Sequence, residues 1–164
     1  MADETSDMAP ASAGGQQFSE HFTRKEFELS GPMPEESVLA FAFLCVNILE
    51  PIRRQFGRPM KITSGDRRPE ANTDAHGNAH SEHVSTVNYC AADFEIPGWA
   101  DLRGVFDWIR LNSGLPFHIV TLEHSAGGVD VIHISWNVDS DARARQAKEG
   151  ATHNSTGYID WAVA

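Results

Sequence analysis

Apolar positions predict one long helix in the first third of the chain. Between Pro34 and Gly57, large apolar side chains recur at spacings of three and four residues, so they share one helical face. These positions are Val38, Phe41, Cys45, Ile48 and Ile52. Pro51 lacks a backbone N–H and predicts a bend near the last turn, and Gly57 ends the helix. Because Cys45 lies on the apolar face, we expect it to pack in the core.

Shorter apolar runs, separated by turn signals, predict further helices and several strands. Thr23-Arg-Lys-Glu26 has the spacing of a capping box and predicts a short helix. The pattern predicts strands at 60–63, 91–96, 117–122, 129–136 and 158–163, and helices at 99–111 and 139–148. Residues 64–82 are rich in Gly, Asn, His, Pro and Ser, so we expect an irregular loop there.

Length and composition indicate one ordinary domain. The chain has 164 residues, of which 41% are hydrophobic, enough for a substantial core. Residues 1–17 are small, polar and acidic, so we expect a disordered tail followed by a single domain over 18–164. The tail lacks the basic and apolar regions of a secretory signal, which predicts synthesis in the cytoplasm, or exit from the cell by another route. No apolar run has the length of a transmembrane helix.

Net charge and cysteine content exclude several classes of protein. A formal charge of −10 argues against a nucleic-acid partner, because phosphate contacts need clustered Lys and Arg. It argues equally against docking on an anionic membrane surface. Two cysteines do not make a disulfide framework. The four tryptophans are interpreted as core and edge packing.

Groups that carry chemistry gather in the predicted loop and in two later strands. The loop holds Arg67, Arg68, His76, His80, Ser81 and His83. Asp93 follows on a strand, and His133 lies in an apolar strand opposite the face of Ile132 and Ile134. Taken alone, His133 is either a hydrogen-bonded core residue or a metal ligand.

Taken together, two histidines and one aspartate suit a catalytic zinc site. Three such ligands carry a net charge of −1 and leave one coordination position for water. A zinc ion there lowers the pKa of its water to about 7 and polarises a carbonyl. A nearby carboxylate must then take the proton. Asp130 is a candidate, although strict alternation points it away from His133 unless the Gly127-Gly128 turn breaks the pattern. Glu123 is interpreted either as a second acid near the site or as a solvated strand end.

Arg67 allows two interpretations of its own. A forked cation binds a carboxylate or a peptide oxygen of a substrate. Alternatively, Arg67 forms a surface salt bridge with Glu70 or Asp74.

Four motifs in order resemble the zinc D-Ala-D-Ala carboxypeptidases and related phage endolysins. They are Ser64-Gly-Asp-Arg67-Arg-Pro69, Ser81-Glu-His83, Ala91-Ala-Asp93 and Asp130-Val-Ile-His133-Ile-Ser-Trp136. Phe22-Thr-Arg-Lys-Glu26-Phe and Leu49-Glu-Pro-Ile-Arg53 also look like short members of that family. The resemblance covers about residues 18–137. It implies an α+β fold shared with hedgehog domains, a small antiparallel sheet flanked by helices.

The resemblance also implies a role for each matching residue. His83, Asp93 and His133 match the zinc ligands, and Asp130 matches the general base. In the substrate site, Arg67 matches the anchoring arginine, and Ser81 matches a serine that orients substrate or loop.

The chain departs from the family pattern in the loop. Nine residues separate His83 from Asp93, where the family has six. If the three extra residues bulge outward, the site is kept, whereas a shift of the strand register by an odd number would turn Asp93 away from the metal. Asp66 replaces an aromatic residue and Glu82 replaces glutamine. Both add negative charge, which should favour a cation and disfavour an anionic peptide terminus. His80 is an alternative third ligand.

These observations support three hypotheses. The first is a zinc metallopeptidase that cuts peptidoglycan stem peptides, carried by a phage and acting on the wall after release or within the virion. The second is an inactive module of similar fold, which binds the wall or other virion proteins. The third is a hedgehog-like binding domain that keeps the metal, since fold alone does not specify function.

Overall fold

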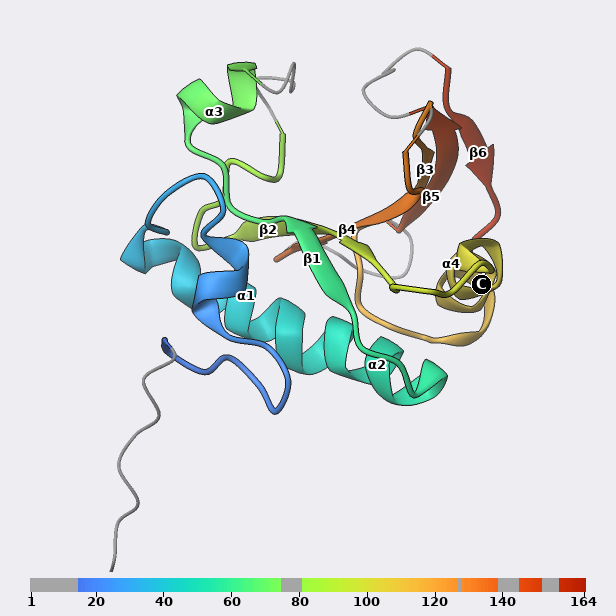
Figure 1. Ribbon diagram of the computed structural model, residues 1–164, viewed down its shortest axis with the longest axis horizontal. Helices are drawn as coiled ribbons and strands as arrows, with labels where there is room; N and C mark the ends of the chain where they lie inside the picture. The colour runs from blue at the N-terminus through green and yellow to red at the C-terminus, as the bar shows by residue number, and fades with distance from the viewer. Residues whose placement is uncertain (1–14, 75–80, 127, 139–144, 152–156) are drawn as a thin grey trace, which may run out of the picture.

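The long helical segment packs on one face of a curved sheet (Figure 1). The computed structural model describes residues 15–74, 81–126, 128–138, 145–151 and 157–164. The sheet has six strands in the order β1-β2-β4-β3-β5-β6. Every pairing is antiparallel except β3 with β5, which is parallel. The expected α+β fold, with a small and mostly antiparallel sheet flanked by helices, is confirmed.

The strands lie close to their expected positions. They are β1 (Lys61–Ser64), β2 (Tyr89–Glu95), β3 (Ile119–His124), β4 (Val131–Asn137), β5 (Gln146–Ala151) and β6 (Ile159–Trp161). The strand β5 corrects the helix expected at 139–148. Gln146 to Lys148 pair with β3, which would otherwise expose an unpaired edge, and Ala147 is buried in the core. Residues 139–144 lie outside the described residues.

The long helix is continuous but not uniform. It comprises a 3₁₀ turn η2 (Glu35–Ser37), the α-helix α1 (Val38–Leu44), a π-helical turn η3 (Cys45–Leu49) and α2 (Glu50–Phe56). The irregularity expected at Pro51 therefore occurs as a π turn just before the proline. A wider turn accommodates the missing N–H without breaking the helix. Gly57 ends α2 with a positive φ of 61°, as predicted.

The remaining helical segments flank the sheet. They are the 3₁₀ helix η1 (Arg24–Phe27), α3 (Pro69–Asp74) and α4 (Leu102–Asn112). In η1, Glu26 Oε2 accepts hydrogen bonds from Thr23 N at 2.7 Å and Thr23 Oγ1 at 2.9 Å, which confirms the predicted reach of Glu26. The expectation of a wholly irregular loop at 64–82 is wrong for α3. Pro69 opens that helix, where its missing N–H costs nothing.

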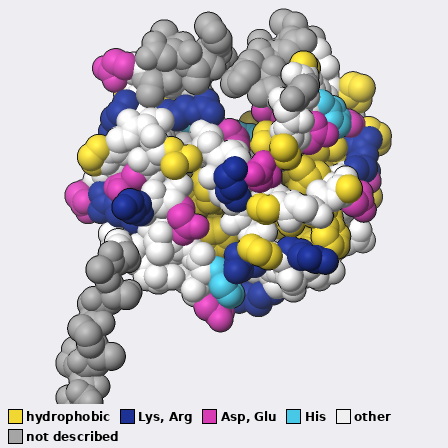
Figure 2. All heavy atoms as spheres, viewed as in Figure 1, with side chains coloured by type: hydrophobic (Ala, Val, Ile, Leu, Met, Phe, Trp, Pro, Cys, Tyr) yellow, Lys and Arg dark blue, Asp and Glu magenta, His cyan; other side chains and the backbone are white. Residues whose placement is uncertain are grey.

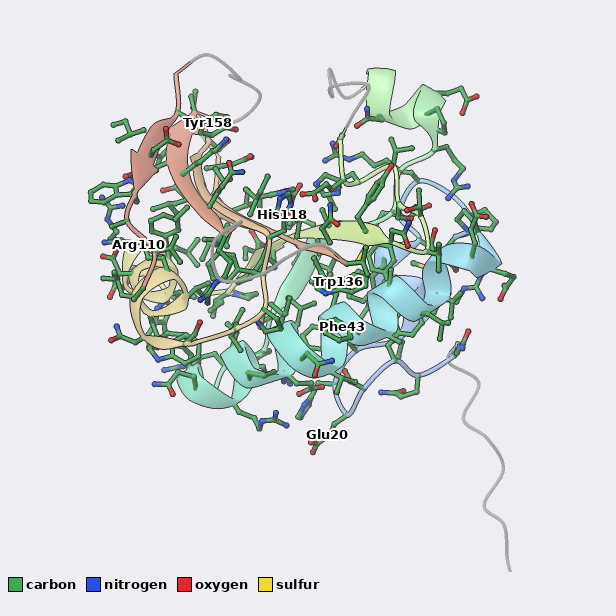
Figure 3. All side chains as sticks on the ribbon, turned by 180° about the vertical axis from the view of Figure 1, so that it is seen from behind. Glu20, Phe43, Arg110, His118, Trp136 and Tyr158 are labelled. Carbon is green, nitrogen blue, oxygen red and sulfur yellow. The ribbon has the colours of Figure 1, made fainter. Side chains whose placement is uncertain are left out.

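Strand alternation divides the sheet into a core face and a polar face. Phe94, Ile132 and Ile134 are buried on the face that packs against α1 and α4, where Cys45 is also buried as expected. All four tryptophans pack against this core, as predicted, and Trp136 lies 4.6 Å from Phe43 between ring centroids (Figure 3). The opposite positions, Asp93 and His133 among them, point toward the loops. Among the described residues, no helix has both the length and the apolarity to cross a membrane.

A buried glutamate joins the N-terminal segment to the long helix. Glu50 is 3% exposed and accepts hydrogen bonds from Ser19 Oγ at 2.8 Å and His21 N at 2.7 Å. Its second oxygen lies 2.9 Å from His21 Nδ1. Burial alone would raise the pKa of Glu50, but the bonds from His21 and Ser19 outweigh it and hold the pKa below its ordinary value.

Glu50→Gln should lower the free energy of unfolding by about 1–3 kcal/mol at neutral pH, because buried donors lose an ionised partner. Since the folded pKa is depressed, this stabilisation is complete above the unfolded-state pKa and disappears as pH falls through the folded one. Urea unfolding of both proteins between pH 7 and pH 3 checks this. A difference that stays constant with pH would contradict it.

Candidate metal centre

Neighbouring antiparallel strands place Asp93 and His133 opposite each other. The two residues are paired in the register of β2 with β4, on the polar face of the sheet. Asp93 Oδ1 lies 2.8 Å from His133 Nδ1. A directly opposed pair keeps its side chains within contact distance. Asp93 is only 8% exposed, so its carboxylate depends on partners rather than on water.

The loop that follows α3 brings His83 to the same pair. His83 Nε2 lies 3.1 Å from Asp93 Oδ1 and 3.2 Å from His133 Nδ1. His83, Asp93 and His133 thus form a compact triangle of donor atoms, called here the HDH cluster. The nine-residue connector does not turn Asp93 away. His80, the alternative ligand, and His76 lie outside the described residues.

The shape of the HDH cluster fits a tetrahedral zinc ion. Ligand atoms at the usual 2.0–2.1 Å from zinc lie about 3.3 Å apart in a tetrahedron. The three distances in the cluster, 2.8, 3.1 and 3.2 Å, are close to that value. Two imidazoles and one carboxylate are also ligands that zinc prefers. The residues present therefore fit the metal.

A backbone carbonyl orients His83 for this role. His83 Nδ1 lies 2.8 Å from Gly65 O, so Nδ1 carries the hydrogen and donates it, which leaves the lone pair of Nε2 for the cluster. The backbone of the same histidine is held as well, because His83 O accepts a hydrogen bond from Arg67 N at 2.8 Å. Sequence reasoning missed Gly65 as a contributor, since a carbonyl leaves no side-chain signal.

Gly65 has to be glycine for a steric reason. A Cβ added there would lie 2.5 Å from Phe27 O and 2.6 Å from Phe27 Cα, both backbone atoms. In addition, Asp66 N donates to Phe27 O at 2.9 Å. The ligand loop thus rests directly on the end of η1, and this contact sets the position of the carbonyl that orients His83.

Electrostatics within the HDH cluster keep Asp93 ionised. Burial would raise the pKa of Asp93, but His83 and His133 outweigh it and hold the pKa well below its ordinary range. For His133, burial would lower the pKa, yet the bond to Asp93 prevails and raises it. The cluster therefore combines the ionised carboxylate of Asp93 with two basic imidazole nitrogens, an arrangement that suits a divalent cation.

Arg67 reaches the same carboxylate. Its Nη2 donates to Asp93 Oδ2 at 3.3 Å, and its Nε donates to Ser64 Oγ at 2.8 Å. The salt bridge that the structure describes for Arg67 is with Asp93, and the side chain of Asp74, one partner of the alternative interpretation, lies outside the described residues. The side chain of Arg67 is 14% exposed and is held at the site from two directions.

Ser81 supports the turn that carries His83. Ser81 Oγ accepts a hydrogen bond from His83 N at 3.3 Å, and Ser81 O accepts one from Val84 N at 3.0 Å. These contacts assign Ser81 a place in the loop. A role in binding substrate stays a prediction.

The two acidic replacements in the loop are both paired. Asp66 is 1% exposed and forms hydrogen bonds with Arg68 and Ser85. Glu82 Oε1 lies 2.6 Å from His118 Nδ1. Burial would raise the pKa of Glu82, but bonds with His118 and Ser135 lower it. Asp66 is thus paired within the loop, whereas the charge of Glu82 also acts on His133 and contributes to raising its pKa.

Asp130 is placed apart from the HDH cluster. Its Oδ2 lies 2.8 Å from His124 Nδ1, and its Oδ1 accepts a hydrogen bond from Ser125 N at 3.1 Å. His124 Nε2 in turn lies 2.8 Å from Glu149 Oε1, on the side of the sheet that carries α4. The expected break in alternation, which was to turn Asp130 toward His133, is not seen at the start of β4. Its role as general base stays a prediction.

A second group of potential ligands lies elsewhere. Glu20, His21 and Glu50 also bring donor atoms together among the described residues. Figure 3 shows Glu20 beyond the helices, on the far side of the sheet from Tyr158. Both oxygens of Glu50 already accept hydrogen bonds, and Glu20 and His21 are exposed. We interpret this second group as a structural junction.

A family model described as Peptidase M15 matches residues 20–110, more than half of the chain. The chain belongs to the Peptidase M15 family. The matched segment includes His83 and Asp93 and ends before β3 and β4, which carry Asp130 and His133. Peptidases of this family are zinc enzymes, in agreement with the donor set of the HDH cluster. No curated protein matches the chain.

Zinc should bind to the HDH cluster at about one ion per chain and raise the melting temperature, because it binds only the folded state. Asp93→Asn and His133→Ala should each lose most of this binding, whereas His21→Gln, in the second group, should keep it. Elemental analysis after dialysis against zinc, together with thermal unfolding, checks this. Loss of zinc in His21→Gln alone would show that the site is misplaced.

Gly65→Ala should lower the free energy of unfolding by about 1–3 kcal/mol through overpacking against Phe27. It should also weaken zinc binding about 10- to 100-fold, because the carbonyl that orients His83 moves. Gly57→Ala is the matched control. It has a positive φ but open space around it, so it should lose stability and keep zinc affinity. Competition with a chromophoric chelator measures the affinities, and equal values for the two variants would contradict the assignment.

Proposed function

We propose that this protein is a zinc peptidase that hydrolyses peptide bonds in the stem peptides of bacterial peptidoglycan. The observation that carries the proposal is the HDH cluster, with three donor atoms in a zinc-like triangle on the polar face of the sheet. Membership in the Peptidase M15 family supports peptide hydrolysis as the reaction class. The four motifs that resemble D-Ala-D-Ala carboxypeptidases and endolysins support the substrate class.

The arrangement of the elements supports a peptide substrate. In Figure 1, α3 stands on one flank of the polar face of the sheet, and β3, β5 and β6 stand on the other. Basic side chains, dark blue in Figure 2, lie on the α3 flank. An extended chain laid between these flanks would cross the polar face, where Asp93 and His133 lie.

Each residue of the site has a distinct task in this proposal. A bound zinc would polarise the scissile carbonyl and lower the pKa of a water molecule. His83, Asp93 and His133 would hold that ion. Arg67, fixed by Ser64 and Asp93, would direct its guanidinium to a carboxylate or carbonyl oxygen of the peptide. A carboxylate must also accept a proton from the attacking water and deliver it to the leaving nitrogen.

One observation favours a second candidate function. Asp130, the acid that the resemblance implies as general base, is engaged by His124 and Ser125. A chain that held zinc but had no acid at the site would serve as a binding module, for the wall or for other virion proteins. The two functions differ in one measurement, which is peptide cleavage by the zinc-loaded protein.

Zinc-loaded protein should release new amino and carboxyl termini from purified peptidoglycan and from a synthetic stem pentapeptide, and a chelator should abolish the release. Liquid chromatography with mass spectrometry identifies the bond that is cut. Zinc-loaded protein that leaves both substrates intact would favour the binding module instead.

Arg67→Lys should raise KM for the stem peptide about tenfold, because a point charge replaces a bidentate fork. Arg103→Lys makes the same exchange on α4, where Arg103 pairs with Glu149, and should leave KM unchanged. Zinc content is measured on both variants, since Arg67 also touches Asp93. An unchanged KM in Arg67→Lys with zinc retained would exclude Arg67 as the substrate anchor.

A further inference from the structure

Three arginines and one histidine line a cavity on the helical side of the sheet, away from the HDH cluster. The cavity has a volume of about 290 Å³ and is lined by His21, Arg53, Arg54, Gly57, Arg58 and Pro59. The arginines belong to the last turn of α2 and to the turn after it, and His21 belongs to the N-terminal segment. In Figure 2, dark blue side chains and a cyan one lie together at the lower edge of the view, over α2. A ligand in this cavity would therefore not occupy the HDH cluster.

The arginines of this cavity have no carboxylate partner, although the chain is strongly acidic. It has 23 acidic and 13 basic residues. Most of the other described arginines form ion pairs with carboxylates, namely Arg24, Arg67, Arg68, Arg103 and Arg110. Among the described residues, no ion pair with an acidic side chain involves Arg53, Arg54 or Arg58. The cavity is thus a local excess of positive charge on a protein of formal charge −10.

Two of the lining side chains are held in place by neighbours outside the cavity. The guanidinium carbon of Arg58 lies 5.2 Å from the centroid of the Trp99 ring, a contact that positions the cation without neutralising it. The indole of Trp99 is fixed in turn, because its Nε1 donates to Asp101 O at 3.1 Å. On the other wall, His21 Nδ1 lies 2.9 Å from Glu50 Oε2, and a carboxylate only accepts, so Nδ1 is the donor and the ring is oriented.

The ordinary preference of a helix end for cations explains only part of this group. The C-terminal end of a helix carries partial negative charge, which favours basic residues in the last turn. This accounts for Arg53 and Arg54. It does not account for Arg58, which lies beyond Gly57, or for His21, which comes from a different segment. The convergence of both segments on one cavity indicates a site for an anion.

The chemistry of the lining favours a phosphate group carried by a flexible chain. Arginine forks bind phosphate oxygens in pairs, and the cavity is at the small end of the usual range for ligand sites, about 300–1,000 Å³. An anionic membrane would bring many charges close to an acidic protein. Single-stranded nucleic acid needs free aromatic faces for its bases, whereas Arg58 already covers one face of Trp99. A flexible polymer delivers its phosphate groups singly and avoids this repulsion.

We propose that this cavity, called here the arginine pocket, binds a phosphate group of a phosphodiester-linked polyol or sugar polymer. His21, Arg53, Arg54 and Arg58 supply the donors, and no covalent step is involved. Binding of phosphate is independent of peptide hydrolysis. That the polymer belongs to the bacterial wall rests on the proposed function. In that setting the arginine pocket would keep the protein on the wall, while the opposite side of the sheet faces the stem peptides.

A synthetic hexamer of glycerol phosphate should bind to the wild-type protein with a Kd of about 1 mM or below, measured by calorimetry at constant ionic strength. Arg53→Gln and Arg58→Gln should each weaken binding about tenfold, because a phosphate loses one charged fork. Arg103→Gln removes the same charge on α4 and should keep the affinity within about twofold. Absence of binding, or an equal loss in Arg103→Gln, overturns the inference.

Three comparison ligands test which phosphate source the arginine pocket takes. They are hexaglutamate, a thymidine hexanucleotide and vesicles of phosphatidylglycerol. Each should bind at least about tenfold more weakly than the glycerol phosphate hexamer, since each lacks the phosphate, adds bases or presents a charged plane. Equal binding of hexaglutamate overturns the preference for phosphate. Tighter binding of the oligonucleotide or the vesicles, lost in Arg58→Gln, overturns the assignment to a polyol or sugar polymer.

A bound zinc could also attract phosphate, so the two sites are separated by their own variants. Asp93→Asn, expected to lose zinc, should bind the hexamer as wild type does, and Arg58→Gln should keep its zinc. Hexamer binding that disappears in Asp93→Asn but persists in Arg58→Gln would place the phosphate at the HDH cluster and overturn the inference.

Sedimentation with bacterial walls tests the partner. Walls that carry phosphodiester-linked polymers are compared before and after treatment with hydrofluoric acid, which cleaves phosphodiesters. The treatment should release wild type and Arg103→Gln, and should leave the weaker binding of Arg58→Gln unchanged. Equal release of all three overturns the role of the arginine pocket. A protein that binds the hexamer through Arg58 but cleaves no stem peptide loses the proposed function alone, whereas one that cleaves the peptide and ignores the hexamer loses this inference alone.

Discussion

The contact between Asp93 and His133 across β2 and β4 is the constraint on which the site depends. It buries an ionised carboxylate beside an imidazole on a sheet whose other face is largely apolar. A buried charge of this kind is stable only with close partners. His83 supplies the second partner from the loop, and Arg67 binds the second oxygen. The register of β2 with β4 alone therefore places two of the three donors opposite each other.

The third donor depends on contacts that lie outside the strands. His83 is held through its ring by Gly65 and through its backbone by Arg67, and the loop that contains these residues rests on Phe27 of η1. The cluster therefore joins the N-terminal 3₁₀ segment, the ligand loop and the centre of the sheet. The family match begins at residue 20 and includes His83 and Asp93, so it spans both the N-terminal segment and the ligand loop that this contact joins.

The elements whose side chains repeat with a fixed period were predicted correctly from the sequence. The three-and-four spacing gave the long helix, and alternation around His133 gave the face on which it lies. What could not be predicted depends on contacts between distant segments. The parallel pairing of β5 has no local signal in the sequence, because a buried alanine such as Ala147 is as compatible with a helix as with a strand. Tyr158 meets Glu123 only through the docking of β6. Asp130 stays on the side that strict alternation assigns to it, although the family resemblance favoured the other.

The connector between His83 and Asp93 is anchored at each end by different contacts. The loop end is tied to Gly65 and Arg67, and the strand end to β4. Ser85, the second residue of the connector, is held separately by the buried Asp66, a residue that itself departs from the family pattern. Because both ends of the connector are held independently, its exposed residues offer a place to insert a reporter or affinity peptide beside the HDH cluster.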